Sequence, residues 1–137
     1  MHHDVYFSLG SNLGDKENNI REAIKRIGEL IGTVERQSTF LVTEPWGLTS
    51  VNSFVNAAIM VTTSMSPEEV LHTTQQIERA MGRTQKSVDG QYHDRIIDID
   101  ILMYDDLRMD SPQLTLPHPL IRERDFVMIP LSEISNK

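Results

Sequence analysis

The order of strand-like and helix-like segments limits the possible folds more than any other feature of this chain. Four strand-type runs are found at residues 5–9, 34–43, 54–63 and 95–104, with amphipathic helix patterns at 15–32 and 66–82. The second and third strands follow one another with no helix between them, which breaks the alternation of a doubly wound parallel fold. The βαββαβ order instead predicts a ferredoxin-like α+β sandwich, a four-stranded antiparallel sheet with the helices packed on it.

The expected ends of both helices carry recognisable capping residues. Asp15 is expected to cap the first helix and Gly32 to close it. The second helix begins at Ser66-Pro67-Glu68-Glu69, where a capping box is expected, and ends at Gly82. A short extended piece at 114–116 and a short helical region within 119–134 complete the prediction.

The length and composition predict one soluble domain over residues 1–137, and they exclude several kinds of site. There are no cysteines, which excludes disulfides and thiolate zinc sites and fits a cytoplasmic protein. No apolar run reaches the roughly 18 residues of a membrane span, and the first residues do not read as a secretory signal, so no membrane partner is expected. The net charge of −7 argues against a nucleic-acid partner. The overall charge does not argue against a small phosphate ligand, because residues 79–95 are locally positive.

Asp98 and Asp100 are the strongest candidates for chemistry. They stand two apart on the last strand, so both point to one face with Cα atoms about 6.6 Å apart, while the isoleucines between and around them enter the core. Magnesium prefers one or two carboxylates together with waters and phosphate oxygens. The alternative is a solvated acidic strand face, which is less favourable because aspartate is depleted in strands and like charges repel.

Other candidates remain open on local pattern alone. Phe54 and Asn56 share a strand face, which suits stacking on a flat heterocycle and reading its edge, although this pattern alone slightly favours a core phenylalanine beside a buried asparagine that bonds to a loop. His118, held between two prolines, suits phosphate binding or a turn cap. Gly10-Ser11-Asn12-Leu13-Gly14 lacks the Lys-Ser/Thr pair of a P-loop and is better explained by backbone freedom close to a ligand.

Taken together, these motifs resemble the 6-hydroxymethyl-7,8-dihydropterin pyrophosphokinases of the folate pathway, over essentially the whole chain. The resemblance rests on residues 10–14, 43–47, 54–58, 77–79 with 82–83, 95–102 and 116–119. It implies the ferredoxin-like fold and the transfer of pyrophosphate from ATP to the pterin hydroxymethyl group, with release of AMP. Two Mg²⁺ ions would be held by Asp98 and Asp100. A monomer is expected.

The resemblance also implies roles for individual residues. The catalytic group would be Asp98, Asp100, Arg83 and Arg95. The pterin would be bound by Thr43, Pro45, Phe54, Asn56 and Phe126. ATP would be bound by Glu78, Arg83, Lys86, Tyr92, Arg95, Ile99, Thr115, His118 and Arg124. The loop from Lys86 to Asp94 would close over the reactants.

The sequence departs from the family pattern at a few places. Gln85 and Gln113 stand where many members have basic residues, and Tyr92-His93-Asp94 replaces a tryptophan-glycine-proline run. These departures leave a second hypothesis open, a non-catalytic nucleotide- or metal-binding module on the same fold. An RNA-binding domain is a third, against which the net charge of −7 argues.

Overall fold

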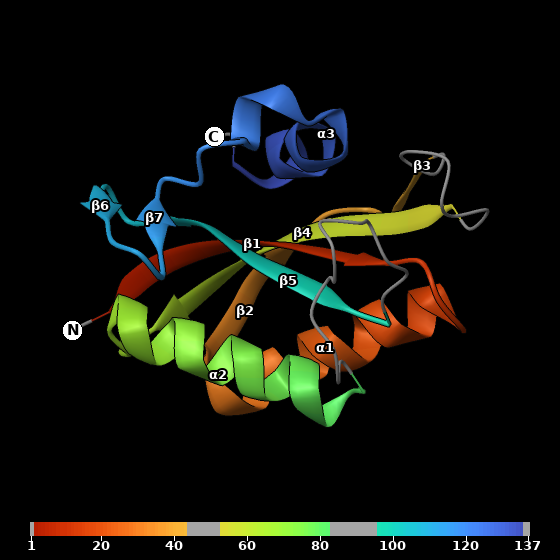
Figure 1. Cartoon of the computed structure of the whole chain (residues 1–137), viewed down its shortest axis with the longest axis horizontal. Coiled ribbons are helices and arrows are strands. Elements are labelled where there is room, and N and C mark those ends of the chain that lie inside the picture. The colour runs from red at the N-terminus through yellow and green to blue at the C-terminus, as the bar shows by residue number, and fades with distance from the viewer. Residues whose placement is uncertain (1, 44–52, 83–95, 136–137) are drawn as a thin grey trace.

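The computed structural model describes residues 2–43, 53–82 and 96–135. Three α-helices and an antiparallel sheet make up this part of the chain (Figure 1). The strands of the main sheet are β1 (His3–Ser11), β2 (Gly32–Gln37), β3 (Leu41–Thr43), β4 (Phe54–Thr63) and β5 (Asp98–Tyr104). Their order is β2-β4-β1-β5, and β3 also pairs with β4. The helices are α1 (Lys16–Leu30), α2 (Pro67–Ala80) and α3 (Asp125–Ile134). No helix within the described ranges is long and apolar enough to cross a bilayer.

The sheet separates two hydrophobic cores. Val5, Phe7 and Leu9 of β1 are fully buried and pack with α1 and α2 on one face, while Ala58 and Leu102 pack with α3 on the other. Figure 1 shows α1 and α2 beneath the sheet and α3 above it. Alternate residues of a strand point to opposite faces. The even-numbered residues of β1 therefore face the α3 side, where the candidate site lies.

The expected helix starts are confirmed. The Asp15 side chain accepts a hydrogen bond from the Asn18 backbone N–H at 3.3 Å. At α2, Ser66 and Glu69 form the reciprocal capping box, and Pro67 is the first helical residue. Each cap satisfies N–H groups that have no partner within the helix.

The expected role of Gly32 as the helix cap is wrong. The C-cap of α1 is Ile31, and Gly32 is already the first residue of β2. A Cβ atom at Gly32 would lie 2.0 Å from the Thr62 carbonyl oxygen of β4. Glycine is therefore required by close approach of two backbones rather than by a left-handed turn.

We predict that Gly32→Ala lowers the free energy of unfolding by about 2–3 kcal/mol, the upper range for overpacking, because the Thr62 backbone must move. Gly28→Ala is the matched control, since its Cβ would meet Val34 Cγ2 at an ordinary 3.7 Å within α1. That control should gain about 0.5–1 kcal/mol from helix propensity. Urea unfolding of both variants measures the difference, and equal stabilities would contradict this account of Gly32.

The sheet has five strands where four were expected, because residues 34–43 do not form one strand. Gln37 pairs with Ile59 and Leu41 with Asn56, so three residues of this segment face only two of β4. At the break the buried Ser38 donates its backbone N–H to the Ala58 oxygen, and its hydroxyl accepts the Ala58 N–H, both at 2.9 Å. The antiparallel α+β class is confirmed.

The segment after β5 differs in detail from the prediction. The extended piece at 114–116 is β7 (Thr115–Leu116), which pairs with β6 (Met109–Asp110) in a separate two-stranded sheet. The final helical region is a short 3₁₀ turn at Ile121–Glu123 followed by α3. Strand β5 begins at Asp98 rather than at residue 95, which lies outside the described residues.

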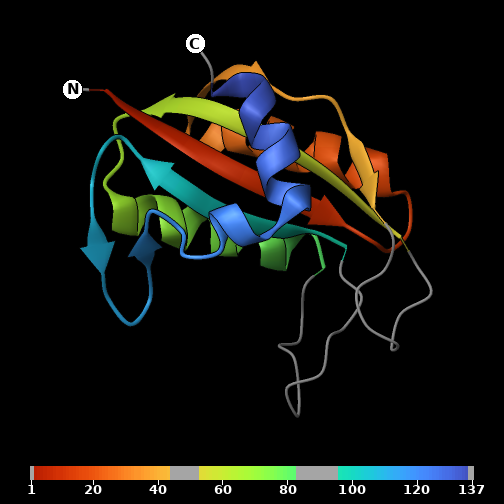
Figure 2. The same cartoon turned by 90° about the horizontal axis from the view of Figure 1, so that it is seen from above.

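Two polar contacts tie α3 to the β2–β3 side of the sheet. Arg36 donates to the Ile134 carbonyl oxygen at the end of α3, at 2.7 Å. The Glu133 carboxylate accepts from both the backbone N–H and the hydroxyl of Thr39, at 2.8–3.0 Å. Figure 2 shows the result, with α3 lying across the sheet over β1. This places Arg124 and Phe126, at the start of α3, above the polar end of the sheet.

Candidate active site

Strand register brings the predicted site residues into two rows across the sheet. Gly10 of β1 pairs with Asn56 of β4 on one side and with Asp98 of β5 on the other. The next row on the same face runs from Ala58 through Ser8 to Asp100. Residues two apart on a strand share a face. The amide, the glycine and the two carboxylates are therefore neighbours although they come from distant parts of the sequence.

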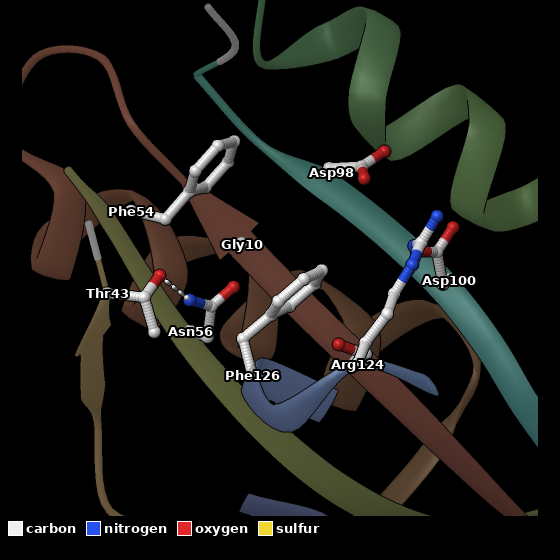
Figure 3. A pocket seen from close by; sticks show the side chains of 9 residues that line it. Gly10, Thr43, Phe54, Asn56, Asp98, Asp100, Arg124 and Phe126 are labelled. Atoms are coloured by element: carbon white, nitrogen blue, oxygen red, sulfur yellow. Dashed lines mark hydrogen bonds between the residues drawn. The ribbon is translucent and has the colours of Figure 1, made fainter. Parts of the chain in front are cut away.

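A pocket lies over these rows, and we call it the Phe54 pocket. It is lined by Ser8, Gly10, Thr43, Phe54, Asn56, Asp98, Asp100, Arg124 and Phe126. Figure 3 shows Phe54 and Asn56 projecting from β4, the two aspartates from β5, and Arg124 and Phe126 from the entry to α3. The Arg124 guanidinium lies 5.5 Å from the centre of the Phe126 ring, a cation–π contact. One side of the pocket is thus aromatic and the other is acidic.

The Asn56 amide is oriented by a hydrogen bond. Asn56 is only 3% exposed, and its Nδ2 donates to the Thr43 hydroxyl at 3.1 Å, as the dashed line in Figure 3 marks. Thr43 stands on β3, opposite Phe54 in the β3–β4 pair. The contact fixes which edge of the amide faces the pocket, and a fixed donor–acceptor edge can select a complementary edge of a heterocycle.

Gly10 keeps the middle of the pocket open. A Cβ atom there would lie 3.0 Å from Asn56 Oδ1 and 3.5 Å from Phe54 Cδ1. The sequence favoured close approach of the backbone over a phosphate loop as the reason for glycine at this position. The short distances around Gly10, on β1, agree with that interpretation. A flat ligand between Phe54 and Phe126 would use this space.

A second pocket adjoins the first, and we call it the His118 pocket. It is lined by Leu71, Thr74, Gln75, Glu78, Asp98, Ile99, Asp100, His118, Leu120 and Arg124. Asp98, Asp100 and Arg124 line both pockets. The two carboxylates are therefore placed where the contents of the two pockets would meet.

Glu78 supports the strand that carries the aspartates. It is 7% exposed on α2, and its Oε2 accepts the Ile99 backbone N–H of β5 at 2.8 Å. Ile99 lies between Asp98 and Asp100, and its side chain is buried with Ile97 and Ile101 in the core, as predicted. The contact holds β5 against α2 at the residue between the two carboxylates.

The His118 ring is held in one tautomer. Its Nδ1 accepts the Leu120 backbone N–H at 3.1 Å, so in the neutral ring the proton is on Nε2. Burial lowers the pKa of His118 below its ordinary 6.5, and Arg124 lowers it further against the opposing effect of Asp98. The neutral ring therefore offers one N–H donor at pH 7.

The lowered pKa of His118 has a consequence for stability. The unfolded chain takes up this proton first as pH falls, so the stability contribution is complete above about pH 6.5 and is lost as pH drops through the native pKa. We predict that the free energy of unfolding falls more steeply between pH 7.5 and 5 for the wild type than for His118→Gln. Urea titrations across this range test it, and parallel curves would contradict the assignment.

The two aspartates fit a magnesium ion. Mg²⁺ takes one or two protein carboxylates and completes its shell with waters and phosphate oxygens. Asp98 and Asp100 provide two half-buried carboxylates on one strand face, open to both pockets. Among the described residues there is no group of three or more His, Asp or Glu side chains that would enclose a metal alone. This donor set matches a metal that is shared with a phosphate ligand.

Several predicted site residues cannot be placed in these pockets. Pro45, Arg83, Lys86, Tyr92 and Arg95 lie outside the described residues, as does the loop from 86 to 94. Thr115 is described, but it lies on β7 and lines neither pocket.

Sequence reasoning also missed residues that line the pockets. Leu71, Thr74 and Gln75 lie three to seven residues before Glu78 on α2, a helical spacing that could have indicated them. Ser8 lies two residues before Gly10 on the same strand face, and this period could have indicated it as well.

Comparison with known proteins identifies the family. The model of the 7,8-dihydro-6-hydroxymethylpterin-pyrophosphokinase family matches residues 6–136. A 2-amino-4-hydroxy-6-hydroxymethyldihydropteridine pyrophosphokinase of Porphyromonas gingivalis is 47% identical over 96% of this chain and 90% of its own. The enzyme of the same name from Bacillus subtilis is 38% identical over 98% of this chain and 79% of its own.

A solved structure shares the fold. The crystal structure of Plasmodium falciparum HPPK-DHPS with pteroate matches with a TM-score of 0.75 and 16% identity, over 96% of this chain and 38% of that longer one. The architecture described above is therefore found in that protein as well. On the family match and the identities over nearly the full length, the chain belongs to the 7,8-dihydro-6-hydroxymethylpterin-pyrophosphokinase family.

Proposed function

We propose that Asp98 and Asp100 are the reaction centre of this pyrophosphokinase. The enzyme transfers pyrophosphate from ATP to 6-hydroxymethyl-7,8-dihydropterin in folate synthesis, which follows from its family. The observation that supports the location is that the Phe54 and His118 pockets share both aspartates and Arg124. A reaction that joins two substrates needs their reacting groups side by side, and much of its acceleration comes from that positioning.

The pterin belongs in the Phe54 pocket. Its flat ring would stack between Phe54 and Phe126, in the space that Gly10 leaves open. The Asn56 amide, held by Thr43, would pair with the donor–acceptor edge of the pterin. The opposite edge of the ring, which carries the hydroxymethyl group, would then face Asp98 and Asp100.

ATP belongs in the His118 pocket. Arg124 supplies a planar cation suited to phosphate oxygens, and the neutral His118 offers Nε2–H as a further donor. Glu78 acts through the Ile99 backbone and keeps β5 in place beside the nucleotide. The β-phosphorus would then lie next to the aspartates, opposite the pterin hydroxyl.

Two Mg²⁺ ions at Asp98 and Asp100 would neutralise the charge of the transferred group and help to activate the attacking hydroxyl. The two carboxylates themselves are fixed in place, because the other face of their strand is anchored in the core. Phosphoryl-type transfer needs positioning and electrostatic stabilisation rather than a covalent nucleophile. The lining of the two pockets supplies those two contributions.

Further residues are assigned by resemblance alone. Arg83 and Arg95 would contribute positive charge to the transition state, while Lys86, Tyr92 and Thr115 would contact ATP and Pro45 the pterin.

We infer that β2, β4, β1 and β5 correspond to the four strands of a ferredoxin-like sheet, which their order supports. We also infer one domain over residues 1–137, acting as a cytoplasmic monomer without nucleic-acid or membrane partners.

The reaction is tested by its products. The protein is mixed with ATP, Mg²⁺ and 6-hydroxymethyl-7,8-dihydropterin, and AMP and ADP are separated by chromatography. We expect one AMP for each pterin consumed, because the pyrophosphoryl unit moves intact. ADP as the product, or AMP formed equally well without the pterin, would contradict the proposal.

A further inference from the structure

Ser8 is a polar residue that lines the Phe54 pocket and has no role in the reaction proposed so far. It lies on β1 between Ala58 of β4 and Asp100 of β5. The residue is only 6% exposed, yet it lines the pocket. Directly opposed residues of antiparallel strands have Cβ atoms about 4.5–5.5 Å apart. The hydroxyl is therefore within reach of whatever lies beside the Asp100 carboxylate.

The surroundings of Ser8 favour a ligand contact. On the same face of the sheet its neighbours Ala58 and Leu102 are buried and apolar and belong to the core beneath α3. No buried side-chain oxygen or nitrogen of the described residues lacks a hydrogen-bond partner, and a hydroxyl beside an apolar core is favourable only where it can form a hydrogen bond. The open side of Ser8 is the pocket itself, next to Gly10 and Asp100.

The position of β1 indicates which part of the ligand Ser8 would meet. Asn56, held by Thr43, would bind one edge of the ring from the β3 and β4 side, and the aspartates lie on β5. Strand β1 lies between β4 and β5, so a ring that reaches from one to the other crosses it. The reacting arm then arrives at the row that contains Ser8 and Asp100.

We propose that the Ser8 hydroxyl donates a hydrogen bond to the hydroxymethyl oxygen of the pterin and holds it beside Asp100. This inference rests on the proposed function of the Phe54 pocket. A serine hydroxyl is one donor and leaves a lone pair of the substrate oxygen available for attack. Ser8 is thus a substrate contact that positions the nucleophile, and it adds selectivity for pterins that carry this arm.

Two ligands that differ in the arm test the contact directly. Binding of 6-hydroxymethyl-7,8-dihydropterin and of 6-methyl-7,8-dihydropterin is measured by calorimetry with Mg²⁺ and α,β-methylene-ATP present. For Ser8→Ala we expect the hydroxymethyl compound to bind about 3- to 10-fold more weakly, the usual range for one neutral hydrogen bond. The 6-methyl compound, which lacks the hydroxyl, should change by less than about twofold, because it never makes that hydrogen bond.

Ser11→Ala is the matched control. Ser11 lies on the same strand but faces the opposite side, where it accepts a hydrogen bond from Asn19 at 3.3 Å. It should leave the ratio of the two affinities unchanged. Ser8→Cys, which keeps the branching of the side chain with a slightly larger atom and a weaker hydrogen-bond donor, provides a second test if Ser8→Ala folds poorly.

The outcomes separate this inference from the proposed function. Equal weakening of both ligands, or no weakening of either, in a folded Ser8 variant would overturn the Ser8 contact while leaving the reaction intact. Failure of the wild-type protein to bind the hydroxymethyl compound or to form AMP would instead contradict the proposed function.

Discussion

Replacing Asp98 or Asp100 by asparagine is expected to lower the rate of AMP formation by about 10³-fold or more. The reason is that, in the proposed site, each carboxylate would hold metal charge at the transferred group and so lower the barrier by several kcal/mol, and each 1.36 kcal/mol is a factor of ten. Asparagine keeps the shape of the side chain and removes the charge. Initial rates with saturating ATP and pterin measure the effect.

Stability separates loss of chemistry from loss of fold in these variants. Asparagine keeps the shape of each half-buried side chain, and Ile99 and Ile101 anchor the same strand in the core. We therefore expect both asparagine variants to remain folded and to unfold cooperatively in urea. Asp110→Asn is the control, since this exposed carboxylate lies on β6 and lines neither pocket. Near-normal turnover by the Asp98 and Asp100 variants would refute the metal role.

Enlarging Gly10 is expected to weaken pterin binding while sparing the nucleotide. The added Cβ of Gly10→Ala would lie 3.0 Å from Asn56 Oδ1 and should raise the KM for the pterin at least about tenfold, as a displaced hydrogen bond and an overpacked site cost 1–3 kcal/mol each. Gly10→Val places two further methyl carbons in the ring space and should raise that KM by about a hundredfold or more. The KM for ATP should remain within about twofold, because Gly10 does not line the His118 pocket.

Gly28→Ala is again the control for the alanine variant. Its added Cβ lies on α1, in ordinary contact with Val34, and both kinetic constants should match the wild type. Parallel rises of the two KM values in Gly10→Ala would indicate a general distortion, and this outcome would contradict a pterin site next to Gly10.

The strand and helix order could be predicted because each segment carries its own periodicity. Asp98 and Asp100 were identifiable for the same reason, since the alternation with buried isoleucines assigns both to one face. Phe54 and Asn56 were placed together by the same period of two. These predictions needed only residues a few positions apart.

Features that depend on pairing between distant segments could not be predicted. The residues from 34 to 43 all suit a strand, and only their register with β4 divides them into β2 and β3. The sequence around Gly32 is typical of a helix cap, and only the pairing of β2 with β4 shows that the Thr62 backbone lies beside it. Phe126 and Arg124 were expected at the site from the family resemblance alone, because no local pattern shows that Arg36 and Glu133 anchor α3 across the sheet, through contacts between residues about 100 positions apart.

The central claim is that the Phe54 and His118 pockets hold the two substrates with their reacting groups at Asp98 and Asp100. The most direct measurement is a crystal structure with the pterin, α,β-methylene-ATP and Mn²⁺ in place of Mg²⁺, with the metal located by anomalous scattering. We expect two manganese peaks at Asp98 and Asp100, between the nucleotide phosphates and the pterin hydroxyl. Manganese bound elsewhere, or the two substrates bound without contact to either aspartate, would contradict it.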